Sequence, residues 1–189
     1  MIIFDLDGTL ADCEHRRHFV DPEKALEKDM HLLKDDIGLY YVDADPAIKS
    51  YWKPDWKSFY EACDEDKPII PTMELYSRLW KESDYYDDFC IWSGRCASVR
   101  KKTEKWLEKY DIRYSELKMR PIGDSTPDDE LKERWLDEYL KLDPNKLEGT
   151  KYSRKDPIEF VFDDRPKVVR MWRHRGIFVF DCNQTGKEF

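Results

Sequence analysis

The chain has 189 residues and a formal net charge of −8, and 40% of its residues are hydrophobic. This content suffices for a hydrophobic core, and the length fits one domain with a modest insertion rather than a disordered chain or two large domains. The negative charge argues against sequence-independent binding to DNA, because such binding rests on neutralising phosphates with Lys and Arg. No apolar run approaches the roughly 20 residues of a membrane-spanning helix. The five cysteines form no C-x-x-C pair, which is typical of free thiols in a reducing compartment, so we expect a soluble cytoplasmic protein.

Short apolar strands alternate with amphipathic helices along most of the chain. This alternation predicts an α/β fold with a mostly parallel sheet and helices on both faces. In chain order the expected elements are a strand at Met1–Asp5, a helix at Thr72–Lys81, a strand at Phe89–Trp92, a helix at Ala97–Tyr110, a strand at Leu117–Arg120, a helix at Pro127–Leu140, a strand at Ile158–Phe162, a helix at Pro166–Arg175 and a strand at Ile177–Phe180.

The stretch 12–66 interrupts this alternation with charged and aromatic residues and several prolines. Because loops of this length without structure are uncommon, we predict a small, mainly helical cap inserted after the first strand. The catalytic core would then comprise residues 1–11 and 67–189. The aromatic side chains of the cap, among them Trp52 and Trp56, fit either a small core of their own or a platform that stacks on a substrate base.

The most informative motif, DLDGTL, begins at Asp5, directly after the first apolar strand. Asp5 and Asp7 are two residues apart at the end of this strand, so their side chains point the same way. Two adjacent carboxylates are costly unless a cation neutralises them, and Mg²⁺ prefers oxygen ligands. A DxDGT sequence followed by Leu or Val at the start of a chain resembles the haloacid-dehalogenase (HAD) superfamily of phosphotransferases. That resemblance implies a Rossmann-like HAD fold.

Two pairs of acidic residues provide the chemistry of a phosphoryl-transfer site. Asp5 would attack phosphorus and form an aspartyl phosphate, while Asp7 would protonate the leaving oxygen and then activate water. Asp163 and Asp164 follow a later strand and would complete the metal site with Asp5 and Asp7. Both pairs fall at the carboxyl ends of predicted strands, where ligands bind in parallel sheets.

Two further residues fit the same site. Ser93 lies in a Trp-Ser-Gly-Arg sequence after a strand, and its hydroxyl can donate a hydrogen bond to a phosphate oxygen. Lys132 lies on a predicted helix and can neutralise the phosphate and Asp5 together. Without such a cation, an anionic nucleophile would be strongly repelled by a dianionic ester. We therefore predict a Mg²⁺-dependent phosphatase.

Several motifs also resemble the 3′-phosphatase domain of bacteriophage polynucleotide kinase-phosphatases. They are DLDGTL at Asp5, Arg16, SGR at Ser93, Arg120, DDELKE at Asp128, DDR at Asp163 and the stretch 168–176. The resemblance implies Thr9, Arg16, Arg95, Arg120 and Asp128 as substrate-binding residues. The three arginines would grip the phosphate or the nucleotide, and Asp128 would orient Lys132 one helical turn away. It also favours Asp164 over Asp163 as the residue that contacts the metal.

Three functions remain open on the sequence. The first is removal of a 3′-phosphate from nucleic-acid ends or nucleotides. The second is hydrolysis of (deoxy)nucleoside 5′-monophosphates, with the cap enclosing one base. The third is a non-catalytic protein whose acidic residues hold a metal or a partner. The sequence contains no G-x-x-x-x-G-K-[ST] phosphate loop, so we expect phosphatase activity without kinase activity. The acidic balance favours a small substrate, whereas the arginines favour a 3′-phosphate.

Overall fold

The computed structural model describes residues 1–25, 28, 53–83, 89–142, 158–184 and 186. The chain divides into two compact units. The first comprises Met1–Asp12 and Lys67–Phe189, and the second comprises Cys13–Asp66. That the second unit serves as a cap for the first remains a prediction.

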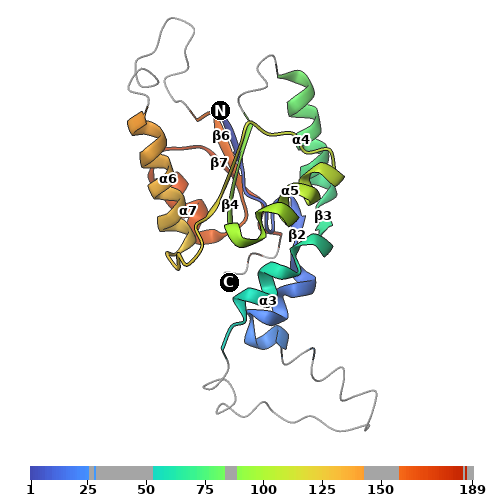
Figure 1. The fold of residues 1–189 in the computed structure, drawn as a ribbon. Coiled ribbons are helices and arrows are strands. Elements are labelled where there is room, and N and C mark those ends of the chain that lie inside the picture. Colours follow the sequence, from blue (N-terminus) through green and yellow to red (C-terminus); the bar gives the residue numbers. More distant parts are fainter. Residues whose placement is uncertain (26–27, 29–52, 84–88, 143–157, 185, 187–189) are drawn as a thin grey trace, which may run out of the picture. The chain divides into compact units, whose positions relative to one another are not determined.

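Five parallel strands form the sheet of the first unit, in the order β5-β4-β1-β6-β7 (Figure 1). The strands are β1 (Ile2–Phe4), β4 (Phe89–Cys96), β5 (Glu116–Arg120), β6 (Phe160–Asp163) and β7 (Val179–Asp181). The predicted α/β fold with a parallel sheet is confirmed. The central position of β1 follows from its three consecutive buried residues, which are typical of a strand covered on both faces.

The helices of the first unit are α4 (Ile70–Glu82), α5 (Arg100–Lys109), α6 (Asp128–Leu142) and α7 (Pro166–His174). The expected helix at Ala97–Tyr110 begins with a 3₁₀ turn, η4 (Ala97–Val99), and becomes α-helical at Arg100. A two-residue antiparallel pair joins β2 (Ala11–Asp12) to β3 (Lys67–Pro68). The sequence did not predict it because two residues are too few to leave a recognisable alternation.

Strand β4 is longer than its apolar run. The sequence predicted a strand that ends at Trp92, but β4 continues to Cys96 and so includes Ser93, Gly94 and Arg95. Its register against β5 shifts between Ser93 and Cys96. Such irregularities re-aim side chains near the end of a strand, which is where these polar residues lie.

Helices α6 and α7 cover one face of the sheet, on the opposite side from α4 and α5 (Figure 1). The buried cluster beneath them includes Ile3, Trp92, Leu131, Trp135 and Trp172. The ring of Trp92 lies 6.0 Å from that of Trp135 and 5.9 Å from that of Trp172, measured between centroids. Burial of these large aromatic side chains anchors both helices to the sheet.

The other face of the sheet carries an aromatic core. The rings of Phe4 and Phe162 stack with their centroids 4.3 Å apart, and Tyr76 of α4 packs edge-on against Phe4 at 4.7 Å. Because side chains alternate along a strand, Asp5 has the orientation of Ile3 and points toward the face covered by α6 and α7. Its backbone N–H continues the sheet by donating to the carbonyl of Phe162 over 2.9 Å.

The second unit contains η1 (Glu14–Phe19), α3 (Trp56–Glu61) and η2 (Cys63–Glu65). Asp55 caps α3, because its carboxylate accepts a hydrogen bond from the backbone N–H of Ser58 over 2.9 Å. Phe59 is buried, whereas Trp56 is 46% exposed and stacks on Tyr60. Trp52 lies outside the described residues. The choice between a small core and a base-stacking platform therefore stays open.

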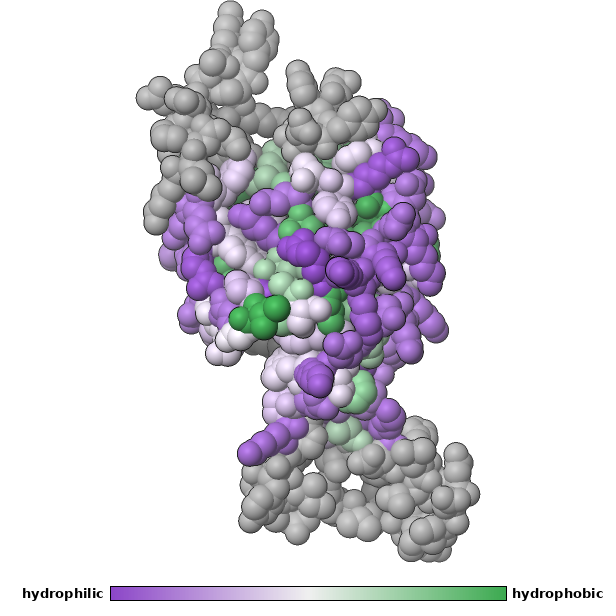
Figure 2. Space-filling model, viewed as in Figure 1, coloured by the Kyte–Doolittle hydropathy of each residue, from purple (hydrophilic) through white to green (hydrophobic). Residues whose placement is uncertain are grey.

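The surface shows no broad apolar area on the face drawn in Figure 2, where hydrophilic side chains cover most of the described part of the first unit. Among the described residues, no helix combines the length and the apolar character needed to cross a membrane.

Candidate active site

Three buried carboxylates meet at the carboxyl ends of β1 and β6. Asp5 follows β1, Asp163 is the last residue of β6, and Asp164 follows it. One carboxylate oxygen of each residue lies within 4.8 Å of the corresponding oxygens of the other two. The sheet brings them together because β1 and β6 are parallel neighbours, so their carboxyl ends share one edge.

Lys132 reaches this acidic triad from α6. Its ammonium donates to Asp5 Oδ1 over 2.8 Å and to Asp163 Oδ2 over 2.7 Å. The lysine side chain is buried, and the indole of Trp172 donates to the same Asp163 oxygen over 3.4 Å. One cation therefore bridges the residues predicted as nucleophile and metal ligand.

The acidic triad holds more negative charge than one lysine neutralises. Burial, together with Asp163 and Asp7, raises the pKa of Asp5 to about 7, although Lys132 opposes the shift. Burial and the neighbouring Asp5 and Asp163 also raise the pKa of Asp164. For Lys132, burial disfavours the charge, but Asp163 and Asp5 outweigh it and raise the pKa. Buried oxygen ligands with surplus negative charge suit a hard divalent cation, so the acidic triad could bind a metal ion.

Asp7 lies outside the acidic triad and pairs with an arginine. Its Oδ1 accepts hydrogen bonds from Arg95 Nε over 2.8 Å and from Arg95 Nη2 over 2.5 Å. The side chain of Arg95 is fully buried, whereas that of Asp7 is 21% exposed. The arginine that was predicted to grip phosphate therefore fixes the orientation of the predicted general acid.

Ser93 lies beside this pair at the end of β4. Its hydroxyl accepts a hydrogen bond from the backbone N–H of Arg95 over 3.2 Å. That bond occupies an acceptor position, so the hydroxyl proton stays available for another acceptor such as a phosphate oxygen.

Arg120 and Asp128 are hydrogen-bond partners of each other. The carboxylate of Asp128 accepts hydrogen bonds from Arg120 and Arg165, and its role in orienting Lys132 stays a prediction. Arg120 also donates to the backbone carbonyls of Gly94, Asp124 and Thr126. These hydrogen bonds connect the loop between β5 and α6 to strand β4, so Arg120 stabilises that loop.

The remaining two candidates lie in different environments. Arg16 belongs to the second unit, where its guanidinium is fully buried and donates to both carboxylate oxygens of Asp66 over 2.7 Å. It also donates to the carbonyl of Phe59 and lies over that ring. Thr9 belongs to the first unit, where its backbone carbonyl accepts from the Thr72 hydroxyl. The Thr9 hydroxyl is buried and has no hydrogen-bond partner among the described residues. Their roles in substrate binding stay predictions.

Arg165 is a residue of the site that was not predicted. It follows Asp163-Asp164 directly, and a cation next to an acidic pair was the available signal. Its backbone N–H donates to Asp163 Oδ1 over 3.2 Å, and its guanidinium donates to Asp128.

Gly8 leaves room for the acidic triad. It has a φ of +84°, and a Cβ at this position would lie 2.0 Å from Asp164 Oδ2. The tight turn after β1 therefore requires glycine at position 8 for two reasons: the backbone angle, and the space that Asp164 occupies. The turn closes through hydrogen bonds from the N–H groups of Leu10 and Ala11 to the carbonyl of Leu6.

Replacing Gly8 with alanine should disrupt the acidic triad. Gly123 is a matched control, because its φ is +83° and a Cβ there would meet nothing within 4 Å. We expect Gly123→Ala to cost about 1 kcal/mol of stability from backbone strain alone, with turnover retained. Gly8→Ala should cost more and abolish turnover, because Asp164 must move. Melting temperature and phosphate release measure both effects, and equal behaviour of the two variants would contradict the contact with Asp164.

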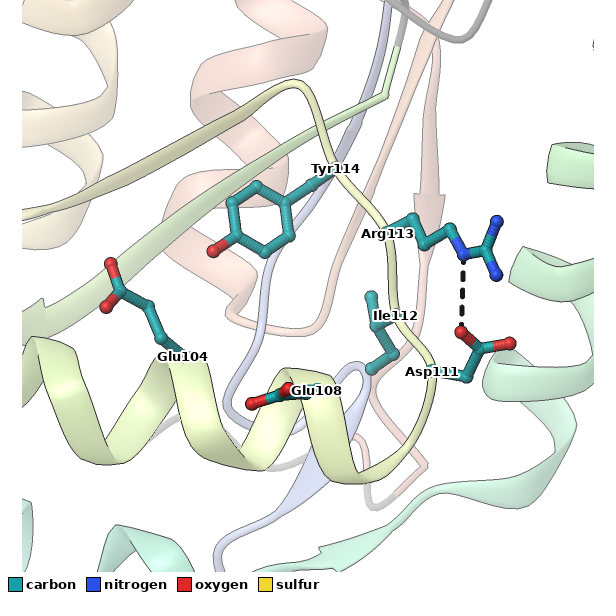
Figure 3. A pocket seen from close by; sticks show the side chains of 6 residues that line it. All are labelled: Glu104, Glu108, Asp111, Ile112, Arg113 and Tyr114. Atoms are coloured by element: carbon teal, nitrogen blue, oxygen red, sulfur yellow. Dashed lines mark hydrogen bonds and ion pairs between the residues drawn. The ribbon is translucent and has the colours of Figure 1, made fainter.

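A separate cavity of about 410 Å³ lies near the amino end of β5 (Figure 3). It is lined by Glu104, Glu108, Asp111, Ile112, Arg113 and Tyr114, from the end of α5 and the loop that leads to the first residue of β5. Arg113 pairs with Asp111 over 3.3 Å at its rim. Because the acidic triad lies at the carboxyl ends of the strands, this cavity is not part of the candidate site.

The chain is similar to known proteins in sequence and in fold. Residues 42–186 match the family described as "Polynucleotide kinase PNKP phosphatase domain". The chain is 44% identical over 144 residues to a protein of Autographa californica nuclear polyhedrosis virus named "Putative bifunctional polynucleotide kinase/RNA ligase". This alignment covers 72% of the chain but only 18% of the viral protein.

Two solved structures share the fold. One, described as "Structure of the Pnkp1/Rnl/Hen1 RNA repair complex", matches 95% of the chain and 41% of its own with a TM-score of 0.56 and 24% identity. The other, "Structure of Pnkp1/Rnl/Hen1 complex", matches 96% of the chain and 45% of its own with a TM-score of 0.56 and 26% identity. The chain thus spans less than half the length of each relative. It belongs to the family of HAD-type phosphatase domains of polynucleotide kinase-phosphatases.

Proposed function

We propose that this chain is a Mg²⁺-dependent polynucleotide 3′-phosphatase that works through a covalent phosphate on Asp5. The observation that carries this proposal is the hydrogen bond from buried Lys132 to Asp5, which holds the nucleophile beside a second carboxylate that can bind metal. Family membership supports the substrate class, because the matching domain is defined by polynucleotide kinase-phosphatases.

The covalent step follows from the placement of two carboxylates. An oxygen of Asp5 attacks phosphorus, a new P–O bond forms, and the bond between phosphorus and the 3′-oxygen breaks. Asp7, oriented by Arg95, delivers its proton to the departing 3′-oxygen. Water then attacks the phosphorus of the aspartyl phosphate while Asp7 takes up a proton, which releases inorganic phosphate and regenerates Asp5.

The other side chains neutralise negative charge and donate hydrogen bonds during these steps. Lys132 holds Asp5 in position and offsets the negative charge of nucleophile and substrate. The Ser93 hydroxyl donates to a phosphate oxygen that does not react. Mg²⁺, bound by Asp5, Asp163 and Asp164, would supply further charge neutralisation at the phosphate.

A panel of substrates tests the proposed function. It contains a 3′-phosphorylated oligonucleotide as DNA and as RNA, the same oligonucleotides with a 5′-phosphate, and 3′- and 5′-mononucleotides. RNA is included because one similar structure comes from an RNA repair complex. Preferential release from 3′-phosphorylated ends supports the proposal. Preference for 5′-mononucleotides would make the protein a nucleotidase, and release from none of them would contradict a phosphatase.

Metal binding should stabilise the protein more at neutral than at acidic pH. The raised pKa of Asp5, about 7 against an ordinary value of 3.8, means that the folded state binds a proton that the unfolded state has already lost within this window. The contribution of Asp5 to the stability of the metal-free protein therefore falls as the pH rises from about 4 to 7. A divalent cation takes the place of the proton, so Mg²⁺ should raise the melting temperature more at about pH 7.5 than at about pH 5.

Thermal melts with and without Mg²⁺ at the two pH values measure this difference. Asp164→Asn, which removes one candidate ligand, should weaken the shift at both values. A Mg²⁺ shift of equal size at both pH values in the unmodified protein would contradict competition between the metal and the proton.

A further inference from the structure

Asp128 links three loops at the edge of the sheet that carries the acidic triad. It is the first residue of α6, and its two carboxylate oxygens accept hydrogen bonds from Arg120 and Arg165, which come from the end of β5 and the start of α7. A Cβ on Gly94 would lie 2.8 Å from Asp128 Oδ1, so the carboxylate packs directly against the backbone of β4. We call Asp128, Arg120 and Arg165 the Asp128 clamp.

Arg120 ties the end of β4, which carries Ser93 and Gly94, to this clamp. Its Nε donates to the carbonyl of Gly94 over 3.0 Å, one residue after Ser93, while its Nη2 donates to Asp128. A single planar guanidinium therefore fixes the end of β4 and the start of α6 relative to each other.

Arg165 ties the clamp to the acidic triad. Its backbone N–H donates to Asp163 Oδ1 over 3.2 Å, and the other oxygen of Asp163 accepts from Lys132 over 2.7 Å. Its guanidinium meanwhile holds Asp128. The charge of Arg165 is favoured by the acidic residues around it, since Asp128, Asp5 and Asp164 outweigh burial and raise its pKa.

The clamp acts on Lys132 through the geometry of α6. Asp128 and Lys132 are four residues apart, which is about one turn or 6 Å along a helix. Fixing the first residue of the helix therefore fixes the backbone position from which Lys132 extends toward Asp5 and Asp163. A shift of about 1 Å in a group near the reacting atoms can cost about 10²-fold in rate.

We propose that Arg165 is a positioning residue, which holds α6 through Asp128 so that Lys132 bridges Asp5 and Asp163. Arg120 holds the end of β4, which carries Ser93, to the same carboxylate. This inference rests on the proposed phosphatase function, because its main effect is on turnover. It assigns to Arg165 an indirect action through Asp128, without direct contact with the substrate.

The test is a double-mutant cycle of Arg165→Met, Asp128→Asn and the two combined, measured on a 3′-phosphorylated oligonucleotide with Mg²⁺. We expect each single variant to lower kcat by about 10–100-fold with KM changed less than about twofold. The combined variant should be no worse than the poorer single variant, because both remove one coupling. Arg165→Lys, which keeps the charge but replaces the planar guanidinium with a single ammonium, should recover part of the lost turnover.

Arg175 provides a matched control at the other end of α7. It also joins α7 to α6, through Glu133 at 3.0 Å and Asp137 at 2.6 Å, but these residues lie outside the acidic triad and the Asp128 clamp. Arg175→Met removes the same charge from the same pair of helices. Because its partners lie outside the acidic triad and the Asp128 clamp, this variant should leave kcat and KM unchanged. If Arg175→Met lost as much turnover as Arg165→Met, the effect of Arg165 would come from helix packing in general, and the positioning role would be overturned.

The remaining outcomes separate the inference from the proposed function. A raised KM with unchanged kcat in Arg165→Met would mean direct contact with the substrate and overturn the positioning role. Additive losses in the cycle would overturn the coupling to Asp128. If the unmodified protein releases phosphate from no substrate, the proposed function fails. The same cycle measured by melting temperature then tests whether Arg165 and Asp128 are coupled. Coupled residues lose stability non-additively, and independent ones lose it additively.

Discussion

Asp5→Asn is expected to lower phosphate release from a 3′-phosphorylated oligonucleotide by about 10⁴-fold or more, since loss of a covalent nucleophile has effects of this order. The amide has nearly the shape of the carboxylate but cannot form the acyl phosphate. The variant should stay folded, because the substitution removes one of three crowded carboxylates while it also removes one ion pair with Lys132. These opposing changes should leave the melting temperature within about 3 °C of the unmodified protein.

Asp181→Asn is the control for this variant. Asp181 ends β7 in register with Asp163, at the same edge of the sheet, but it is exposed and outside the acidic triad. Its replacement should leave turnover unchanged. Single-turnover and steady-state assays on both variants measure the difference. Survival of turnover in Asp5→Asn would show that another residue is the nucleophile.

The sheet and the meeting of its acidic residues were predictable because they depend on chain order and periodicity. Apolar runs predicted β1 and β6, and the parallel arrangement places whatever follows them at one edge. Asp5, Asp163 and Asp164 are close together because β1 and β6 are also neighbours in the sheet. The phase of α6, set by buried Leu131, Trp135 and Leu136, then determines the side from which Lys132 approaches.

The pairing of the arginines was not predictable in the same way. Arg16 pairs with Asp66, which is 50 positions away in the sequence, and Arg95 pairs with Asp7, which is 88 positions away. Such pairs depend on loop conformation and on the shift in register within β4, and neither feature leaves a periodic pattern. The family resemblance implies that Arg95 and Arg120 bind the phosphate or the nucleotide, and this stays a prediction. In the structure both guanidinium groups donate hydrogen bonds to protein groups.

Most of the arginines at the site are already paired with carboxylates outside the acidic triad. Arg95 is matched with Asp7, and Arg120 and Arg165 share Asp128. Lys132 is then the cation that bridges two members of the acidic triad directly, among the residues that the structure describes. Its removal should therefore affect the triad more than loss of any one arginine.

Lys132→Met is expected to lower turnover by about 10²–10³-fold, as loss of one preorganised charge at a reacting centre does. Methionine retains much of the buried volume, so the effect comes mainly from the charge. Stability should fall by about 3 kcal/mol or more, because Asp5 and Asp163 would stay buried without their shared partner. Melting temperature and steady-state kinetics measure the two losses separately.

Adding Asp163→Asn to Lys132→Met separates charge balance from catalysis. The double variant removes one charge of each sign, so it should recover most of the lost melting temperature. It should not recover turnover, since neither the cation that faces the phosphate nor the Asp163 carboxylate is restored. Near-normal turnover in Lys132→Met would contradict the phosphoryl-transfer site as a whole. Recovery of turnover in the double variant would instead mean that Lys132 serves only to neutralise Asp163.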